Sequence, residues 1–299
     1  MPRSELGKRL IVAAIGIPLV VVAVYIGRWA MGPALAFFAG GAAWEFYRLA
    51  ERRGVHPMRL PGVASAAALV LVAMLLPNVS QAAPVLWTTA MVLVLVLSLV
   101  ATWERGVEGQ PLLAVAVTSF GALLPGGAMA YAVFLRHLPL DPNTTPIPYA
   151  TWRSLAGLSL VAYPLAVTWL TDSAAFFAGK RWGKRRLIPS VSPGKTVVGA
   201  VAGLVGGLLG GWAVGHLVMS MWLELPVSPA LGALGGVLIA AVSQAGDLAE
   251  SVWKREAGVK DSGAFFPGHG GILDRMDSLL FTIPASYWWL SLVVRQGVG

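Results

Sequence analysis

Long runs of apolar residues recur along this chain of 299 residues, and they limit the folds that it can adopt. Hydrophobic residues make up 57% of the sequence and charged residues 12%, whereas soluble domains contain about 25% charged residues. A helix needs about 20 mostly apolar residues to cross the hydrocarbon layer of a bilayer. The segments that fit such helices are 10–27, 29–48, 61–77, 84–102, 112–135, 157–178, 196–220, 230–250 and 273–294. The sequence therefore predicts an all-α, polytopic integral membrane protein with about nine transmembrane helices, and the many glycines of 196–220 indicate close helix packing.

The basic residues are distributed unevenly between the two sides of these segments. If the N-terminus is cytoplasmic, all but four of the 22 lysines and arginines lie on the cytoplasmic side; the exceptions are Arg28, Arg136, Arg153 and Arg295. Cytoplasmic loops of membrane proteins carry such an excess of positive charge. We therefore expect a cytoplasmic N-terminus, an external C-terminus and a place in the cytoplasmic (inner) membrane of a bacterium. The same asymmetry accounts for the net charge of +8, so no nucleic-acid partner is implied.

Charged and polar side chains crowd together between residues 251 and 277, on the predicted cytoplasmic side. The segment holds three aspartates, a glutamate, several basic residues and a glycine-rich turn, and the whole chain lacks cysteine, which excludes thiolate metal ligands. Groups of this kind suit a divalent metal ion and a polyphosphate at a membrane surface. We therefore expect a catalytic transmembrane region over 157–299. Over 1–156 we expect about five helices that serve as scaffold, dimer contact or lipid-facing surface.

Two further polar pieces precede this segment. Asp172 lies near the cytoplasmic end of a predicted helix, where it either helps to bind metal or substrate in a hydrated cleft or pairs with a lysine such as Lys180. The basic loop that follows ends in Ser192-Pro-Gly-Lys195. Serine as N-cap, followed by proline at the first helical position, predicts that a helix starts at Ser192. The free backbone N–H groups of that helix start, beside Lys195, would form an anion site. A Walker A motif is excluded, because Pro189 stands where that motif needs glycine.

Acidic residues also occur where the eighth predicted helix ends. Asp247, Ser251 and Lys254 recur at helical spacing on one face, and such a set could hold Mg²⁺ and a phosphate together. Lys254 could instead form a helix-surface ion pair with Glu250.

The glycine-rich turn leads to two more aspartates at the start of the ninth predicted helix. Asp274 and Asp277 are neighbours on one helix face, where they either bind metal opposite Asp247 or interact with the positive end of the helix dipole. Glycines 270 and 271 let backbone N–H groups approach phosphate oxygens, to which His269 could also donate.

The segment resembles the signature of the phosphatidate cytidylyltransferase (CDP-diacylglycerol synthase) family. That signature combines a serine, a Lys-Arg pair, a Lys-Asp pair, a His-Gly-Gly turn and an Asp-Arg-x-Asp end in one fixed register. The matching positions are Ser251, Lys254, Arg255, Lys260, Asp261, Gly263, Phe266, Pro267, His269, Gly270, Gly271, Asp274, Arg275 and Asp277. The resemblance is strongest over about 168–280, and the first five segments match the family only in hydropathy.

The resemblance implies an enzyme of phospholipid biosynthesis. The implied reaction transfers CMP from CTP to phosphatidic acid and yields CDP-diacylglycerol and pyrophosphate. The resemblance implies Mg²⁺ bound by Asp247 and Asp274, and we expect Asp277 to support this metal site. It also implies a second, monovalent cation such as K⁺, and a homodimer. With the two metal-binding aspartates, we expect Lys254 and Arg275 to be catalytic. The residues that we expect to bind substrate are Asp172, Ser192, Lys195, Ser251, Arg255, Lys260, His269, Gly270 and Gly271.

Two other functions fit the sequence less well. A CDP-alcohol phosphotransferase also uses aspartates and Mg²⁺ at a membrane face, but its Asp-Gly-x-x-Ala-Arg motif does not occur in this sequence. An ion-coupled transporter would place its charges near mid-membrane on broken helices of paired repeats, whereas here they gather at one predicted cytoplasmic rim.

Overall fold

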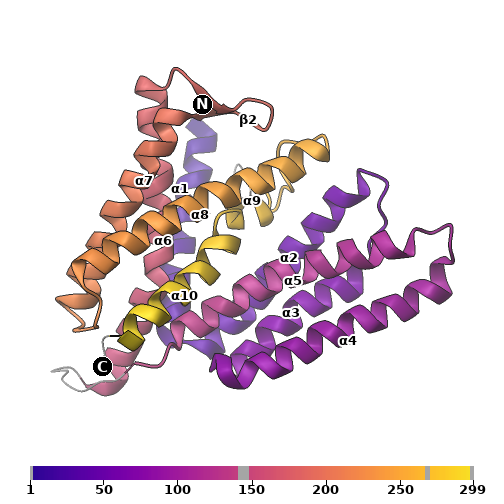
Figure 1. Cartoon of the computed structure of the whole chain (residues 1–299), viewed down its shortest axis with the longest axis horizontal. Helices are drawn as coiled ribbons and strands as arrows, with labels where there is room; N and C mark the ends of the chain where they lie inside the picture. The colour runs from indigo at the N-terminus through magenta and orange to yellow at the C-terminus, as the bar shows by residue number, and fades with distance from the viewer. Residues whose placement is uncertain (1–2, 141–147, 267–269, 297–299) are drawn as a thin grey trace. The chain divides into compact units, whose positions relative to one another are not determined.

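The computed structural model describes residues 3–140, 148–266 and 270–296 (Figure 1). The chain forms two compact units. The first unit comprises Met1–Phe134 and Trp253–Met276, and the second comprises Leu135–Val252 and Asp277–Gly299. The segment 253–276, which carries most of the signature residues, is thus in the same unit as the N-terminal helices.

The first unit is built from helices that pack through small and aromatic residues. Its elements are α1 (Arg3–Ile26), α2 (Arg28–Glu51), α3 (Arg59–Leu75), α4 (Val79–Arg105), most of α5 (Pro111–Arg136), the end of α8 (Pro229–Glu256) and the short α9 (Leu273–Met276). The Tyr47 hydroxyl of α2 donates to the Thr118 carbonyl of α5 at 2.8 Å. The Tyr47 ring also fills the space that a side chain at Gly62 of α3 would need. Tyr47 therefore joins three helices of this unit.

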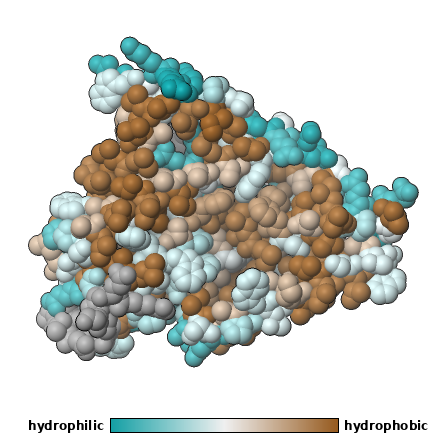
Figure 2. All heavy atoms as spheres, viewed as in Figure 1, coloured by the Kyte–Doolittle hydropathy of each residue, from teal (hydrophilic) through white to brown (hydrophobic). Residues whose placement is uncertain are grey.

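The second unit combines long helices with one small hairpin. Its elements are α6 (Tyr149–Trp182), β1 (Arg186–Ile188), β2 (Ser192–Thr196), α7 (Val197–Trp212), the π-helical η1 (Ala213–Ser220), most of α8 and α10 (Leu279–Gln296). Helices α6 and α7 pack along each other, and the antiparallel strands pair Arg186 with Thr196 and Ile188 with Ser192. In Figure 2 hydrophilic residues gather around this hairpin, whereas apolar residues cover α7.

Glycines let α7 and α8 approach each other closely. A Cβ atom at Gly207 would overlap the Ala240 side chain, and one at Gly211 would overlap the backbone at Gly232 and Gly236. Small residues serve this purpose in membrane helices, because dispersion contacts between closely spaced backbones stabilise the pair. The prediction that these glycines serve packing is confirmed.

The all-α class is confirmed for the described residues, with the hairpin as the exception. In the part of the chain that the structure describes, five helices are long and apolar enough to cross a membrane: Val79–Arg105, Pro111–Arg136, Tyr149–Trp182, Val197–Ser220 and Pro229–Glu256. Ala14–Ile26 and Arg59–Leu75 are shorter apolar helices. The ninth predicted segment begins later than expected, because α9 ends at Met276 and α10 starts at Leu279. Asp274 consequently lies on a separate short helix.

Candidate active site

Asp274 is the centre of the polar contacts in the signature segment. Its side chain is only 4% exposed. Oδ2 accepts hydrogen bonds from the backbone N–H groups of Ser262 and Gly271, both at 2.8 Å, and lies 3.0 Å from the Ser262 hydroxyl oxygen. Oδ1 lies 2.8 Å from the Lys254 ammonium. Asp274 thereby links the end of α8 to both sides of the glycine-rich turn.

These contacts keep the Asp274 carboxyl ionised. Burial by itself raises the pKa of this group, because desolvation penalises the charged form. The hydrogen bonds from Lys254, Gly271 and Ser262 act in the opposite direction and hold the pKa of Asp274 below its ordinary value. The carboxylate and the Lys254 ammonium therefore form a charged, largely buried pair.

A second buried carboxylate, Glu45 of α2, contacts the same segment. Glu45 is only 6% exposed. Oε1 accepts a hydrogen bond from the Ile272 N–H at 3.0 Å, and Oε2 accepts one from the Leu273 N–H at 2.9 Å and one from the Ser262 hydroxyl at 2.8 Å. The Ser262 side chain therefore lies between the carboxylates of Glu45 and Asp274.

Two glycines make room for these carboxylates. Gly270 has a φ of +82°, which side chains rarely adopt, and a Cβ atom there would press against Asp274. A Cβ atom at Gly271 would overlap both Glu45 and Ser262. The Phe266 N–H donates to the Gly270 carbonyl at 2.9 Å. The shape of this segment thus depends on glycine at both positions.

In the second unit, acidic residues surround Lys195. The Lys195 ammonium lies 2.7 Å from Oδ2 of Asp247, and the Ser251 hydroxyl donates to Oδ1 of Asp247 at 3.4 Å. Asp172 interacts electrostatically with Asp247, Asp277 and Lys195. The structure therefore brings together the predicted residues of α6, β2 and α8 with the aspartate that precedes α10. Lys180 was the alternative partner considered for Asp172. Its ammonium lies over the Phe176 ring.

The predicted helix start at Ser192 is wrong. Residues Ser192–Thr196 form strand β2, and α7 begins at Val197. Thr196 is the N-cap, and its side chain accepts a hydrogen bond from the Gly199 N–H at 3.1 Å. Pairing with β1 keeps the backbone extended through Thr196, so the Ser-Pro-Gly-Lys piece lies on a strand and not at free helical N–H groups.

The basic residues of the signature differ in their exposure. Lys254 is partly buried by its pairing with Asp274, whereas Arg255, Lys260 and Arg275 are exposed. Arg255 donates to the Val259 carbonyl at 2.9 Å. The predicted ligand His269 lies outside the described residues. Exposed cations of this kind can reorient towards a bound anion.

Whether these residues can bind Mg²⁺ depends on how many further contacts each carboxylate oxygen can accept. Among the residues that the structure describes, no three His, Asp or Glu side chains form a group able to hold a metal ion. Oδ2 of Asp274 already accepts two backbone hydrogen bonds, whereas Oδ1 of Asp274 and both oxygens of Asp247 have one polar contact each. A carboxylate oxygen has about two acceptor sites, so these three oxygens have capacity for a further ligand. Each of the two carboxylates can therefore still provide an oxygen ligand to a hard cation whose other ligands are water or substrate oxygens.

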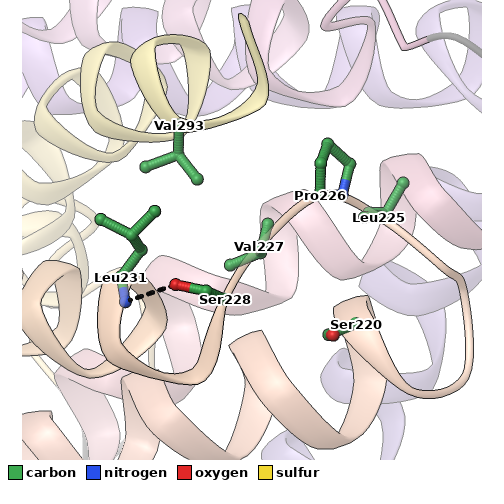
Figure 3. A pocket seen from close by; sticks show the side chains of 7 residues that line it. All are labelled: Ser220, Leu225, Pro226, Val227, Ser228, Leu231 and Val293. Carbon is green, nitrogen blue, oxygen red and sulfur yellow. Dashed lines mark hydrogen bonds between the residues drawn. The ribbon is translucent and has the colours of Figure 1, made fainter. Parts of the chain in front are cut away.

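Two cavities, one in each unit, are lined by uncharged residues. One of about 360 Å³ in the second unit is lined by Ser220, Leu225, Pro226, Val227, Ser228, Leu231 and Val293 (Figure 3). It borders the first turn of α8, where the Leu231 N–H donates to the Ser228 hydroxyl at 3.2 Å. Asp247 follows about 16 residues later on the same helix, roughly 24 Å away along its axis. No charged side chain lines this cavity, so it is unsuited to hold a triphosphate.

The family of the chain follows from comparison with known proteins. Residues 7–293 match the cytidylyltransferase family. The chain belongs to this family. A phosphatidate cytidylyltransferase from Synechocystis is 34% identical over 308 aligned positions, which cover 96% of this chain and 97% of that protein. The phosphatidate cytidylyltransferase of Bacillus subtilis is 44% identical over 136 residues, 46% of this chain and 49% of that protein. The uncharacterized protein YnbB of Escherichia coli is 36% identical over 171 residues, 57% of this chain and 52% of that protein.

Membership of the cytidylyltransferase family confirms the resemblance that the signature residues indicate.

Glu45 was not among the site residues that the sequence predicted. The signal for it was a carboxylate inside the apolar segment 29–48, because ionisable residues within membrane helices are rare and mark functional sites. Nothing in the local pattern around Glu45 indicates its partners, which are more than 200 residues away in the sequence.

Proposed function

We propose that this protein is a phosphatidate cytidylyltransferase, which transfers CMP from CTP to phosphatidic acid and releases pyrophosphate. The observation that carries the proposal is the 34% identity to the Synechocystis enzyme of that name over 96% of the chain. The match of residues 7–293 to the cytidylyltransferase family and the presence of every charged signature residue support it.

The reaction requires alignment and charge neutralisation more than acid–base chemistry. A phosphate oxygen of phosphatidate, already ionised, attacks the α-phosphorus of CTP. The bond from that phosphorus to the bridging oxygen of the β-phosphate breaks, and pyrophosphate leaves with the electron pair. No proton has to leave the nucleophile, so a general base is not obligatory. The protein accelerates such a step by positioning two anions and stabilising the charge on the leaving group.

The basic residues have complementary roles in this proposal. Lys254, Arg255, Lys260 and Arg275 contact the triphosphate, since arginine can bind phosphate through two hydrogen bonds and lysine acts as a point charge. Ser192 and Lys195 hold the phosphatidate headgroup. The ion pair of Lys254 with Asp274 supports the first assignment, because it holds an ammonium in place beside the glycine-rich turn.

We propose Mg²⁺ as the cofactor, with Asp247, Asp274 and Asp277 as its protein ligands and K⁺ as a second ion. When bound, the metal neutralises charge on phosphate oxygens and orients them. The acceptor capacity that remains on Asp247 and on Oδ1 of Asp274 supports this choice.

The arrangement in the membrane is also a proposal. We infer nine transmembrane helices, a cytoplasmic N-terminus, an external C-terminus, a site that faces the cytoplasm and a homodimer in the inner membrane. The uneven distribution of lysine and arginine supports the orientation. Basic residues on that side would also attract the anionic lipid substrate, at about 1 kcal/mol each near an anionic surface.

The function is tested with purified protein, phosphatidate, Mg²⁺ and each of the four ribonucleoside triphosphates in turn. We expect a CDP-lipid with CTP and no product after the metal is chelated. Asp247→Asn and Asp274→Asn should each lower turnover by about 100-fold or more, because the neutral amide is a weaker ligand for metal and cations. Glu104→Gln, a change at an exposed carboxylate, is the control and should retain activity. Near wild-type turnover in both asparagine variants would remove these aspartates from the mechanism, and no nucleotidyl lipid with any triphosphate would refute the function.

A further inference from the structure

We propose that Glu45 is a positioning residue for nucleotidyl transfer: from α2 it holds the signature segment in the shape that places Lys254 and Asp274. The inference rests on the proposed function for its activity assays, but the local order of the segment can be measured without them. Glu45 lies in the N-terminal part of the chain and outside the signature itself.

The contacts of Glu45 reach both sides of the glycine-rich turn. Before the turn it accepts from the Ser262 hydroxyl, and after the turn it accepts from the consecutive N–H groups of Ile272 and Leu273. Asp274 follows directly and receives its own hydrogen bonds from Ser262 and Gly271. A shift of the Glu45 carboxylate must therefore be transmitted to Asp274 and to its partner Lys254.

The packing around Glu45 is as specific as its hydrogen bonds. The three atoms nearest to a Cβ at Gly263 would all belong to Glu45, and a Cβ at Gly271 would meet Glu45 and Ser262. About two turns before Glu45 on the same helix, Phe37 lies against Phe265 at 5.9 Å and Phe38 is stacked on Phe266 at 6.4 Å between ring centroids. Helix α2 therefore forms a platform for the segment, and Glu45 supplies its polar part.

The chemistry of the contacts requires a carboxylate. Glu45 uses both oxygens as acceptors for backbone N–H groups. Glutamine has the same shape but only one acceptor oxygen, so its amide N–H₂ would face one of the two backbone donors. A buried donor without an acceptor is costly, and the segment would have to move to relieve it.

The central test compares Glu45→Gln with the wild type. We expect kcat to fall by about 100-fold, since a displacement of about 1 Å at a reacting centre has effects of this size. We expect the thermal midpoint of the protein in detergent to change by only a few degrees. Amide hydrogen exchange should accelerate in segments 259–266 and 270–276 and remain unchanged in α4. A merely structural role would lower the thermal midpoint and accelerate exchange throughout the unit, with kcat of the folded fraction unchanged.

Glu51→Gln is the matched control. Glu51 lies on the same helix and forms an ion pair with Arg59, but that pair does not involve the signature segment. The control should retain wild-type kcat and wild-type exchange in 259–276. If Glu45→Gln folds and turns over CTP at the wild-type rate, the proposal is overturned.

A second variant decides the question if Glu45→Gln does not fold. Gly263→Ala introduces a methyl group whose three nearest atoms all belong to the Glu45 side chain. We expect it to lower kcat through displacement of Glu45, and we expect Glu45→Ala with Gly263→Ala to be no worse than Glu45→Ala alone. Additive losses in the double variant, or full activity in Gly263→Ala, would contradict the proposal. A wild-type protein that makes no CDP-lipid would instead refute the proposed function and leave the exchange experiment intact.

Discussion

At the scale of single residues, two carboxylates and one ammonium determine the shape of the signature segment. Asp274 and Glu45 are both buried. Glu45 accepts three hydrogen bonds from this segment, and Asp274 accepts two from its backbone and pairs with Lys254. Hydrogen bonds to charged groups contribute about 1.5–3 kcal/mol each, and a buried charge that loses its partner is strongly destabilising. The segment is therefore ordered by buried polar contacts, although the chain as a whole is mostly apolar.

The ion pair of Lys254 with Asp274 gives a prediction at this scale. Lys254→Met removes the ammonium while keeping an unbranched side chain of similar length, and it leaves Asp274 with less compensation in a site where its side chain is 4% exposed. Breaking a buried pair in this way costs about 3–5 kcal/mol. We expect a lower thermal midpoint and a loss of CTP turnover by at least about 100-fold. Arg52→Gln, at an exposed cation of the same unit, is the control. A stable and active Lys254→Met protein would show that the pair has neither role.

At the scale of helices and strands, glycine and the N-cap decide where elements end and how closely they approach. Thr196 and not Ser192 begins α7, because β2 continues to Thr196 and only then does the backbone turn into the helix. Along α7, Gly207 and Gly211 lie against the backbone of α8. The spacing of α7 and α8 in the second unit thus depends on small residues, at positions where larger side chains have no space.

Substitution of Gly211 tests this packing. Gly211→Leu should separate α7 from α8, since its side chain would overlap the backbone at Gly232 and Gly236. Overpacking typically costs about 1–3 kcal/mol and more when backbone has to move. We expect a clearly lower thermal midpoint and a poor yield of folded protein. Gly127→Leu in α5, where a Cβ atom meets nothing within 4 Å, is the matched control and should be tolerated. Equal stability of the two variants would show that close packing at Gly211 is unimportant.

At the scale of the whole molecule, the distribution of charge gives the expected orientation in the membrane. The chain has no cysteine, so single cysteines can be introduced without other changes. We expect a membrane-impermeant maleimide to label Met221→Cys in intact cells and to label Lys184→Cys only after the membrane is permeabilised. Both positions are exposed in the structure. The reverse pattern would place the basic loop outside and would contradict the cytoplasmic site.

Much of this organisation could be read from the sequence alone. Apolar length predicts helices, because a bilayer offers backbone N–H and C=O groups no other partners. Each predicted segment overlaps a helix, but the seventh continues from α7 into η1 and the ninth is divided between α9 and α10. The signature residues predicted the family, since their types and spacing are visible in a single continuous stretch.

Other features depend on contacts between distant parts of the chain. The hydrogen bond from the Leu273 N–H to Glu45 joins residues that are 228 positions apart, and no local pattern encodes such a pairing. The same holds for the pairing of Lys254 with Asp274 across the glycine-rich turn. The sequence determined which residues are apolar, charged or conformationally permissive, and with them the helices and the family. Only the tertiary structure decided which buried donors meet which carboxylates, because that choice depends on how folded segments fill the same space.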